Sequence, residues 1–296
     1  MVTAHAQRAS LASPENEAYF IKRCGYLLSG EFNKGIWRIL VMAVLTFLGT
    51  GGDAYTVGRQ LLGAGGIVVE LSGNQFHLDP GPGSLQAAKE CSIDVRRTVA
   101  VLVSHNHLNH AHDLNAVLSA MTYGGLDPRG VVLAADSVVE GLGARLHPRD
   151  ARFAEKVLAV SDSSRVGIND VDVHITPALH SDSSAVGFVL SSGRERIGYT
   201  GDTGLSSEVA EAFVGVDTLI ACVSRTDENA DVHHLSPSSV VELANTVNPR
   251  TLVLTHFDQQ LLKRDVRNLG RLVSQQVDCH VVVASDGARV DTSMYR

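Results

Sequence analysis

The sequence predicts an α/β fold in which two β-sheets pack face to face between outer helices, an αββα sandwich. Apolar runs of four to eight residues, typical of buried strands, alternate with segments whose apolar residues recur every three or four positions, typical of helices. These elements form two β-rich halves, each with flanking helices. There is no internal repeat, low-complexity segment or Pro/Ser linker, so we expect one domain over residues 42–296.

Ten strands are predicted from apolar runs: Gly66–Leu71, Gln75–Leu78, Val99–Val103, Gly130–Leu133, Val171–Ile175, Val186–Leu190, Ile197–Thr200, Thr218–Val223, Thr251–Thr255 and His280–Ala284. Five helices are predicted from helical spacing: Ser84–Glu90, Leu114–Thr122, Ser206–Phe213, Pro237–Thr246 and Asp258–Gln275. In the fourth helix, Ser236 is the expected N-cap and Pro237 the first helical residue.

Three histidines directly follow the apolar run Thr98–Val103: His105, His107 and His110. Neutral imidazole is the commonest protein ligand for a catalytic transition metal. Two residues apart on an extended segment, His105 and His107 can point the same way, and His110 can join them where the chain turns into a helix. The spacing predicts a metal site at the end of this strand.

Three more ligand-type side chains follow apolar, strand-like runs: His180, Asp202 and His256. One histidine or aspartate after a strand is often a cap or a turn residue. The repetition of this arrangement favours a single site built at the ends of buried strands.

With these motifs in place, residues 43–290 resemble the metallo-β-lactamase superfamily. Thr46–Gly52 is similar to the family's opening strand and turn, and Leu78–Gly81 to its Asp-Pro-Gly turn near the metals. The resemblance implies the family's αββα sandwich, with the site along one edge. It also implies two metal sites: His105, His107 and His180 with Asp202 in the first, and His110 and His256 with a bridging Asp202 in the second.

Two motifs of this sequence resemble those of the branch of the superfamily that contains ribonuclease Z and related phosphodiesterases. One is Gly201-Asp202-Thr203, and the other is His234-Leu235-Ser236, 22 residues before His256. The resemblance implies that His234 lies near the scissile phosphate and assists the leaving group; its neighbour His233 is expected to be solvated. Only 21 residues separate His180 from Asp202, where ribonuclease Z carries its tRNA-binding arm, so compact phosphodiesterases, including those for cyclic nucleotides, are favoured over tRNA processing.

Asn109 departs from the family pattern, which has aspartate there as a second-metal ligand and proton acceptor. An amide is a poor zinc ligand and cannot act as a general base. The protein therefore has either a weaker second site that still works or a mononuclear or inactive site. Retained activity is favoured because the other ligands are present. His112 and Asp113 are close enough in sequence to substitute in part.

The predicted chemistry is metal-assisted hydrolysis, in which zinc lowers the pKa of its bound water to about 7. Asp202, His234 and Asn109 are the predicted catalytic positions. Histidine and carboxylate ligands also suit manganese and iron. Three functions remain open: a phosphodiesterase, a lactonase or β-lactam-type hydrolase that needs an apolar acyl pocket, and a non-catalytic metal-binding protein suggested by Asn109.

The composition limits the kinds of partner and the cellular location that we expect. The chain has 296 residues and a net charge of -7, which argues against broad nucleic-acid binding and leaves a small-molecule or nucleotide substrate. The four cysteines form no Cys-x-x-Cys pair, so reduced, mostly buried thiols and a cytoplasmic protein are expected. The longest apolar run, Ile39–Phe47, is too short to span a membrane.

Residues 1–41 precede the part of the chain that resembles the family. They are expected to be an N-terminal extension, and their apolar side chains favour an arm that packs on the body or on a second subunit. The oligomeric state stays open, homodimers being the commonest assembly in general.

Overall fold

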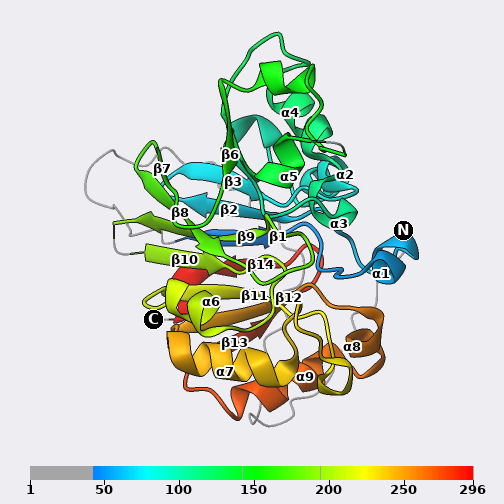
Figure 1. Cartoon of the computed structure of the whole chain (residues 1–296), viewed down its shortest axis with the longest axis vertical. Helices are drawn as coiled ribbons and strands as arrows, with labels where there is room; N and C mark the ends of the chain where they lie inside the picture. The colour runs from blue at the N-terminus through cyan, green and yellow to red at the C-terminus, as the bar shows by residue number, and fades with distance from the viewer. Residues whose placement is uncertain (1–42, 142, 194, 296) are drawn as a thin grey trace, which may run out of the picture. The chain divides into compact units, whose positions relative to one another are not determined.

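The structure, a computed structural model, describes residues 43–141, 143–193 and 195–295. The predicted extension, residues 1–41, lies outside the described residues. Two seven-stranded sheets lie against each other, with helices on both outer faces (Figure 1). This arrangement is the predicted αββα sandwich.

The first sheet has the strand order β14-β1-β2-β3-β4-β5-β6. Strands β3 to β6 are parallel, whereas β14, β1, β2 and β3 pair antiparallel. The bounds are β1 Val44–Phe47, β2 Ile67–Leu71, β3 Asn74–Leu78, β4 Thr98–Val103, β5 Val131–Ala135, β6 Lys156–Val160 and β14 Arg289–Asp291.

The second sheet has the order β13-β12-β11-β10-β9-β8-β7. Strands β10 to β13 are parallel, and β7 to β10 pair antiparallel. The bounds are β7 Arg165–Ile168, β8 Val171–Pro177, β9 Val186–Ser192, β10 Glu195–Tyr199, β11 Thr218–Cys222, β12 Thr251–Thr255 and β13 His280–Val283.

Helices α2 Ser84–Glu90, α3 Leu108–Ala111, α4 Leu114–Met121 and α5 Asp136–Val139 lie on the side of the first sheet (Figure 1). Helices α6 Ser207–Ala212, α7 Pro237–Val247, α8 Gln259–Lys263 and α9 Val266–Ser274 lie on the side of the second, and α1 Ala54–Gly58 follows β1. The main core fills the space between the sheets and extends under α4, which buries Leu114, Val117, Leu118 and Met121. A second core packs α6, α7 and α9 on the outer face of the second sheet.

All ten predicted strands are present, and so is the predicted start of α7: Ser236 is its N-cap and Pro237 its first residue. Strands β6, β7 and β14 were not predicted because each mixes exposed and buried positions at a sheet edge. The single helix predicted over Asp258–Gln275 is wrong. It is broken into α8 and α9 at Asp265, whose φ of 63° cannot continue a helix.

Two further expectations can be compared with the structure. Of the described cysteines, which are all free, Cys222 is buried but Cys91 and Cys279 are only half-buried; Cys24 lies outside the described residues. Within the described ranges, we find no helix with the length and apolar character that a bilayer crossing requires.

Candidate metal centre

The predicted ligands meet at one edge of the two sheets. Parallel strands β4, β10 and β12 end one to three residues before His105, Asp202 and His256. Because parallel strands present their carboxyl ends at the same edge, these three side chains come from both sheets to one place. His107 and His110 follow at the start of α3 and within it, and His180 follows β8.

The first ligand group consists of His105, His107, His180 and Asp202, whose ligand atoms all lie within 4.8 Å of one another. Nδ1 of His107 lies 3.0 Å from Nε2 of His105 and 3.1 Å from Nε2 of His180. All but His107 are buried. The side chains predicted for the first metal are therefore brought together.

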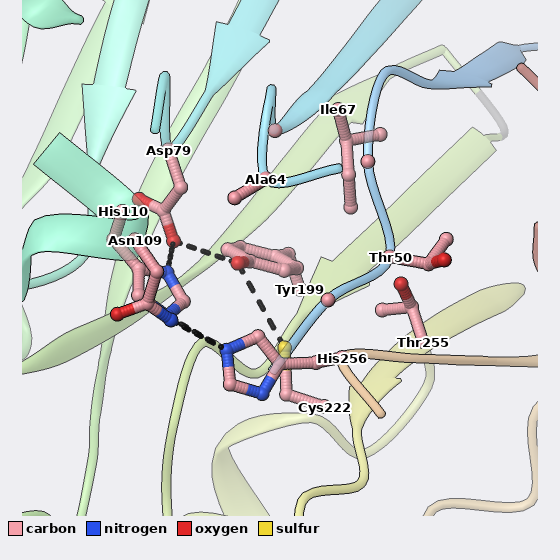
Figure 2. Close-up of a pocket in the computed structure, with 13 residues that line it drawn as sticks. Thr50, Ala64, Ile67, Asp79, Asn109, His110, Tyr199, Cys222, Thr255 and His256 are labelled. Atoms are coloured by element: carbon pink, nitrogen blue, oxygen red, sulfur yellow. Dashed lines mark hydrogen bonds and ion pairs between the residues drawn. The ribbon is translucent and has the colours of Figure 1, made fainter. Parts of the chain in front are cut away.

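The second group consists of His110, Asp202 and His256, again within 4.8 Å of one another. Nε2 of His110 lies 2.8 Å from Nε2 of His256 (Figure 2). Oδ2 of Asp202 lies 3.4 Å from His110, and Oδ1 lies 3.2 Å from His256. Asp202 belongs to both groups, which is the geometry expected of a bridging carboxylate.

Neighbouring groups determine which nitrogen of each ring faces the centre. Ser104 donates its only hydroxyl hydrogen to Asp79, so it accepts from Nδ1–H of His105, 2.9 Å away. Nδ1–H of His110 donates to Asp79, and Nδ1–H of His180 donates to the carbonyl of His233. The Nε2 atoms of these three rings therefore point inward, the orientation that metal ligands require.

The donor set fits a divalent metal ion. Nε2 of His105 and of His180 approach Nδ1 of His107 closely, yet these three nitrogens share at most one hydrogen. Buried Oδ1 of Asp202 has no hydrogen-bond partner among the described residues. A bound cation would accept the lone pairs of these close nitrogens and would give Oδ1 of Asp202 a partner. Imidazole nitrogens with a carboxylate oxygen are also the ligands that zinc prefers.

The pKa values favour the neutral, metal-binding form of four of the five rings. Burial lowers the pKa of His105, His107 and His180, and lowers that of His256 to about 4. His110 differs: burial lowers its pKa, but the charge of Asp202 and hydrogen bonds to Asp202 and Asp79 outweigh burial and raise it to about 10. A metal bound by His110 must therefore displace a proton.

Asp79, in the turn that was matched to the Asp-Pro-Gly motif, organises the centre without facing it. Its Oδ1 accepts from the backbone N–H of Ser104 at 2.6 Å. Its Oδ2 accepts from the Ser104 hydroxyl at 2.6 Å. The same oxygen accepts from the Tyr199 hydroxyl and from Nδ1–H of His110, at 2.6 and 2.8 Å (Figure 2). Asp79 also falls within ligand distance of His105 and His110, but these four hydrogen bonds leave it the role of an orienting group.

Two glycines allow the ligand loops to come this close. A Cβ on Gly81 would lie 1.9 Å from the carbonyl oxygen of Asn109, so only glycine lets the Asp-Pro-Gly turn contact α3. Gly201 has a φ of +58° and would place a Cβ 3.0 Å from Cβ of Ser104. In the same motif, the Thr203 hydroxyl accepts from the backbone N–H of Leu179, which ties the His180 segment to the Asp202 loop.

Asn109 lies at the second ligand group, at the position expected from the motif. Its Nδ2 is 3.2 Å from Nε2 of His256 (Figure 2). Rotation of the amide by half a turn leaves its shape unchanged and presents Oδ1 instead. The side chain can therefore offer a neutral oxygen to a metal held by His110, His256 and Asp202, but no negative charge.

His112 and Asp113 do not replace the missing carboxylate. Asp113 Oδ2 accepts from the backbone N–H groups of Gly83 and Ser84, and its Oδ1 contacts Nδ1 of His112 at 2.7 Å. Asp113 is thus engaged at the start of α2 and His112 is paired with it, and neither belongs to a ligand group among the described residues. The expectation that they substitute in part is not supported.

His234 lies beside the first ligand group, with its ring centre 5.1 Å from that of His180. Its Nδ1 contacts both oxygens of Asp231, at 2.9 and 3.0 Å, which leaves Nε2 available. Burial raises the pKa of Asp231, but hydrogen bonds from His234 and from the His233 backbone hold it at about 2. His233 is half-buried rather than solvated, and its carbonyl orients His180.

The residues that orient the ligands and His234 were not predicted from the sequence: Ser104, Tyr199, Ser224 and Asp231. Ser224, after β11, contacts Nδ1 of His256 at 2.6 Å. A weak signal existed, since Ser104, Tyr199 and Ser224 each lie within two residues of the end of a predicted strand.

Replacing Asp79 tests its role as an organising group. In Asp79→Asn the hydrogen bonds from His110 and Ser104 lose their charged acceptor, and we expect zinc to bind about 10- to 100-fold more weakly. Competition with a chromogenic chelator measures this affinity. Asp127→Asn, which removes an exposed carboxylate paired with Arg96, should leave it unchanged. A folded Asp79→Asn protein with wild-type zinc affinity would contradict the assignment.

The chain is similar in sequence to several known proteins. The family model for the beta-lactamase superfamily domain matches residues 74–257. An uncharacterised protein of Methanocaldococcus jannaschii, MJ1374, is 31% identical over 256 residues, covering 83% of this chain and 94% of the relative. Ribonuclease Z of Mycobacterium bovis is 24% identical over 279 residues, covering 84% and 98%. A metal-dependent hydrolase of Caldivirga maquilingensis is 24% identical over 239 residues, covering 76% and 94%.

Among solved structures, the metallo-β-lactamase fold protein YhfI of Bacillus subtilis superposes with a TM-score of 0.70 at 16% identity. The superposition covers 84% of this chain and 98% of YhfI, and it shows the shared fold. With the ligand geometry above, these findings show that the chain belongs to the metallo-β-lactamase superfamily of metal-dependent hydrolases, in its ribonuclease Z-like branch.

Proposed function

We propose that the protein is a zinc-dependent phosphodiesterase with two metal sites, the second weakened by Asn109. The observation that carries this proposal is the pair of ligand groups that share Asp202, with the His234–Asp231 pair beside them. When bound, the metal ions would supply Lewis acidity and an activated water at this edge of the sheets.

The protein's own residues would position the substrate and move the proton of the leaving group. His234 has one ring nitrogen held by charged Asp231, which also accepts from Nε of Arg225 at 2.9 Å. A histidine oriented in this way can present a proton from Nε2 to a leaving oxygen. Asn109 cannot accept a proton as aspartate would, so His234 is the principal proton-transfer group in this proposal.

A small or nucleotide substrate agrees with the surroundings of the centre. The chain between His180 and Asp202 forms a short loop followed by β9 and β10 of the second sheet. A long tRNA-binding arm has no place in that segment, and the net charge of -7 disfavours a large polyanion. We also propose a cytoplasmic location, which suits the free thiols of the described cysteines.

One observation favours a lactonase as the second candidate. Leu108, Leu179 and Val232 are 50%, 40% and 68% exposed, and each lies within two residues of a histidine of the site. Such side chains can contact the acyl part of a lactone, the apolar surface that this alternative requires. They can also contact an aromatic or nucleobase group of a phosphodiester.

Hydrolysis assays separate these functions. The zinc-loaded protein should hydrolyse bis(p-nitrophenyl) phosphate, and it should lose this activity with chelator and regain it with zinc. His107→Ala should be inactive because it removes a ligand, whereas His112→Ala, an exposed histidine of the same segment, should stay active. Opening of a homoserine lactone without phosphodiester hydrolysis would instead support the lactonase.

Asn109→Asp tests the second site. Aspartate adds a charged ligand beside His256, so we expect the second zinc to bind at least tenfold more tightly, as measured by metal titration. The unmodified protein should already hydrolyse the phosphodiester. If activity appears only in Asn109→Asp, the protein is a non-catalytic metal-binding member of the family.

A further inference from the structure

Arg145, in the chain segment after α5, is a cation placed beside the metal-ligand loop. Its Nε lies 2.9 Å from Oδ1 and 3.5 Å from the backbone oxygen of Asn106. Asn106 lies between His105 and His107, two ligands of the first group. The guanidinium group is therefore held against the loop that carries the metal ligands.

Hydrogen bonds hold both the backbone and Nε of Arg145. Its backbone N–H donates to Val138 at 2.9 Å, and its carbonyl accepts from Asn115 at 2.8 Å. The amide of Asn106 is itself oriented, because Nδ2 donates to the carbonyls of Ser137 and Gly143 at 2.7 and 3.1 Å. Oδ1 of Asn106 is thereby directed at Arg145.

The charge of Arg145 is not neutralised by this arrangement. Within the described residues its side chain bonds only through Nε, to neutral oxygens of Asn106, and no carboxylate there forms an ion pair with it. Asp182, nearby in the same network, accepts from neutral donors: the Asn106 N–H at 3.0 Å and the hydroxyls of Ser137 and Ser184 at 2.6 and 2.8 Å. By contrast, Arg225 on the His234 side is paired with Asp231.

We infer that Arg145 binds an anionic phosphate oxygen of the substrate and selects anionic phosphodiesters over neutral esters. The inference rests on the proposed phosphodiesterase function and deepens it. An arginine fixed through Nε leaves its two terminal nitrogens as a planar pair of donors, the geometry that suits phosphate oxygens. Because the side chain is half-buried and already oriented, little conformational freedom is lost when the anion binds.

The kinetic test compares an anionic and a neutral substrate of the same shape. In Arg145→Gln we expect KM for bis(p-nitrophenyl) phosphate to rise about tenfold, with little change for its neutral methyl triester. Arg145→Lys should be intermediate, because it keeps the charge but loses the paired donors. Arg152→Gln, an exposed arginine beyond His147 on the same segment, is the matched control and should behave as wild type.

A binding measurement separates this inference from the proposed function. Calorimetric titration of the zinc-loaded protein with inorganic phosphate should show about tenfold weaker binding in Arg145→Gln, with zinc content unchanged. Equal effects on both esters, loss of zinc, or phosphate binding as in wild type would overturn the inference and assign Arg145 a structural role. Arg145-dependent phosphate binding in a wild-type protein without phosphodiester turnover would support the inference and contradict the proposed function.

Discussion

The hydrogen bonds received by the buried carboxylate of Asp79 are the interaction on which the metal centre depends. Ser104 and His110 donate to it from the first half of the chain, and Tyr199 donates from β10 of the second sheet. One carboxylate therefore links the two sheets at the edge where the ligands meet. It also determines which nitrogens of His105 and His110 face the metals, since both rings use Nδ1–H toward this network.

The geometry of the strands explains why the ligands meet at one place. Parallel strands end at one edge, so ligands that are far apart in the sequence come within 4.8 Å of one another in each of the two groups. His256 occupies this edge with a φ of 68°, a conformation that costs energy for a residue other than glycine. Its ring contacts Asp202, Ser224 and Asn109, and these contacts keep it in place.

The sequence was sufficient to predict the buried strands and the residues that form the ligand groups, because apolar runs and histidine spacing are local signals. Edge strands such as β7, with exposed Arg165 and Gly167, lack that signal. The helix break at Asp265 depends on a left-handed backbone conformation, which the residue pattern did not predict. The orienting contacts of Tyr199, Asp231 and Arg145 could not be predicted from the sequence either. Each is a side-chain hydrogen bond, and the sequence does not indicate which residue is the partner.

We propose that these side chains form one preorganised centre for two metal ions bridged by Asp202. Anomalous diffraction from crystals of the zinc-loaded protein would locate both ions. We expect one zinc bound by Nδ1 of His107 with Nε2 of His105 and His180, and another, more weakly occupied, bound by Nε2 of His110 and His256. Asp202 should contact both ions. Zinc bound elsewhere, or bound without Asp202, would show that these side chains do not form such a centre.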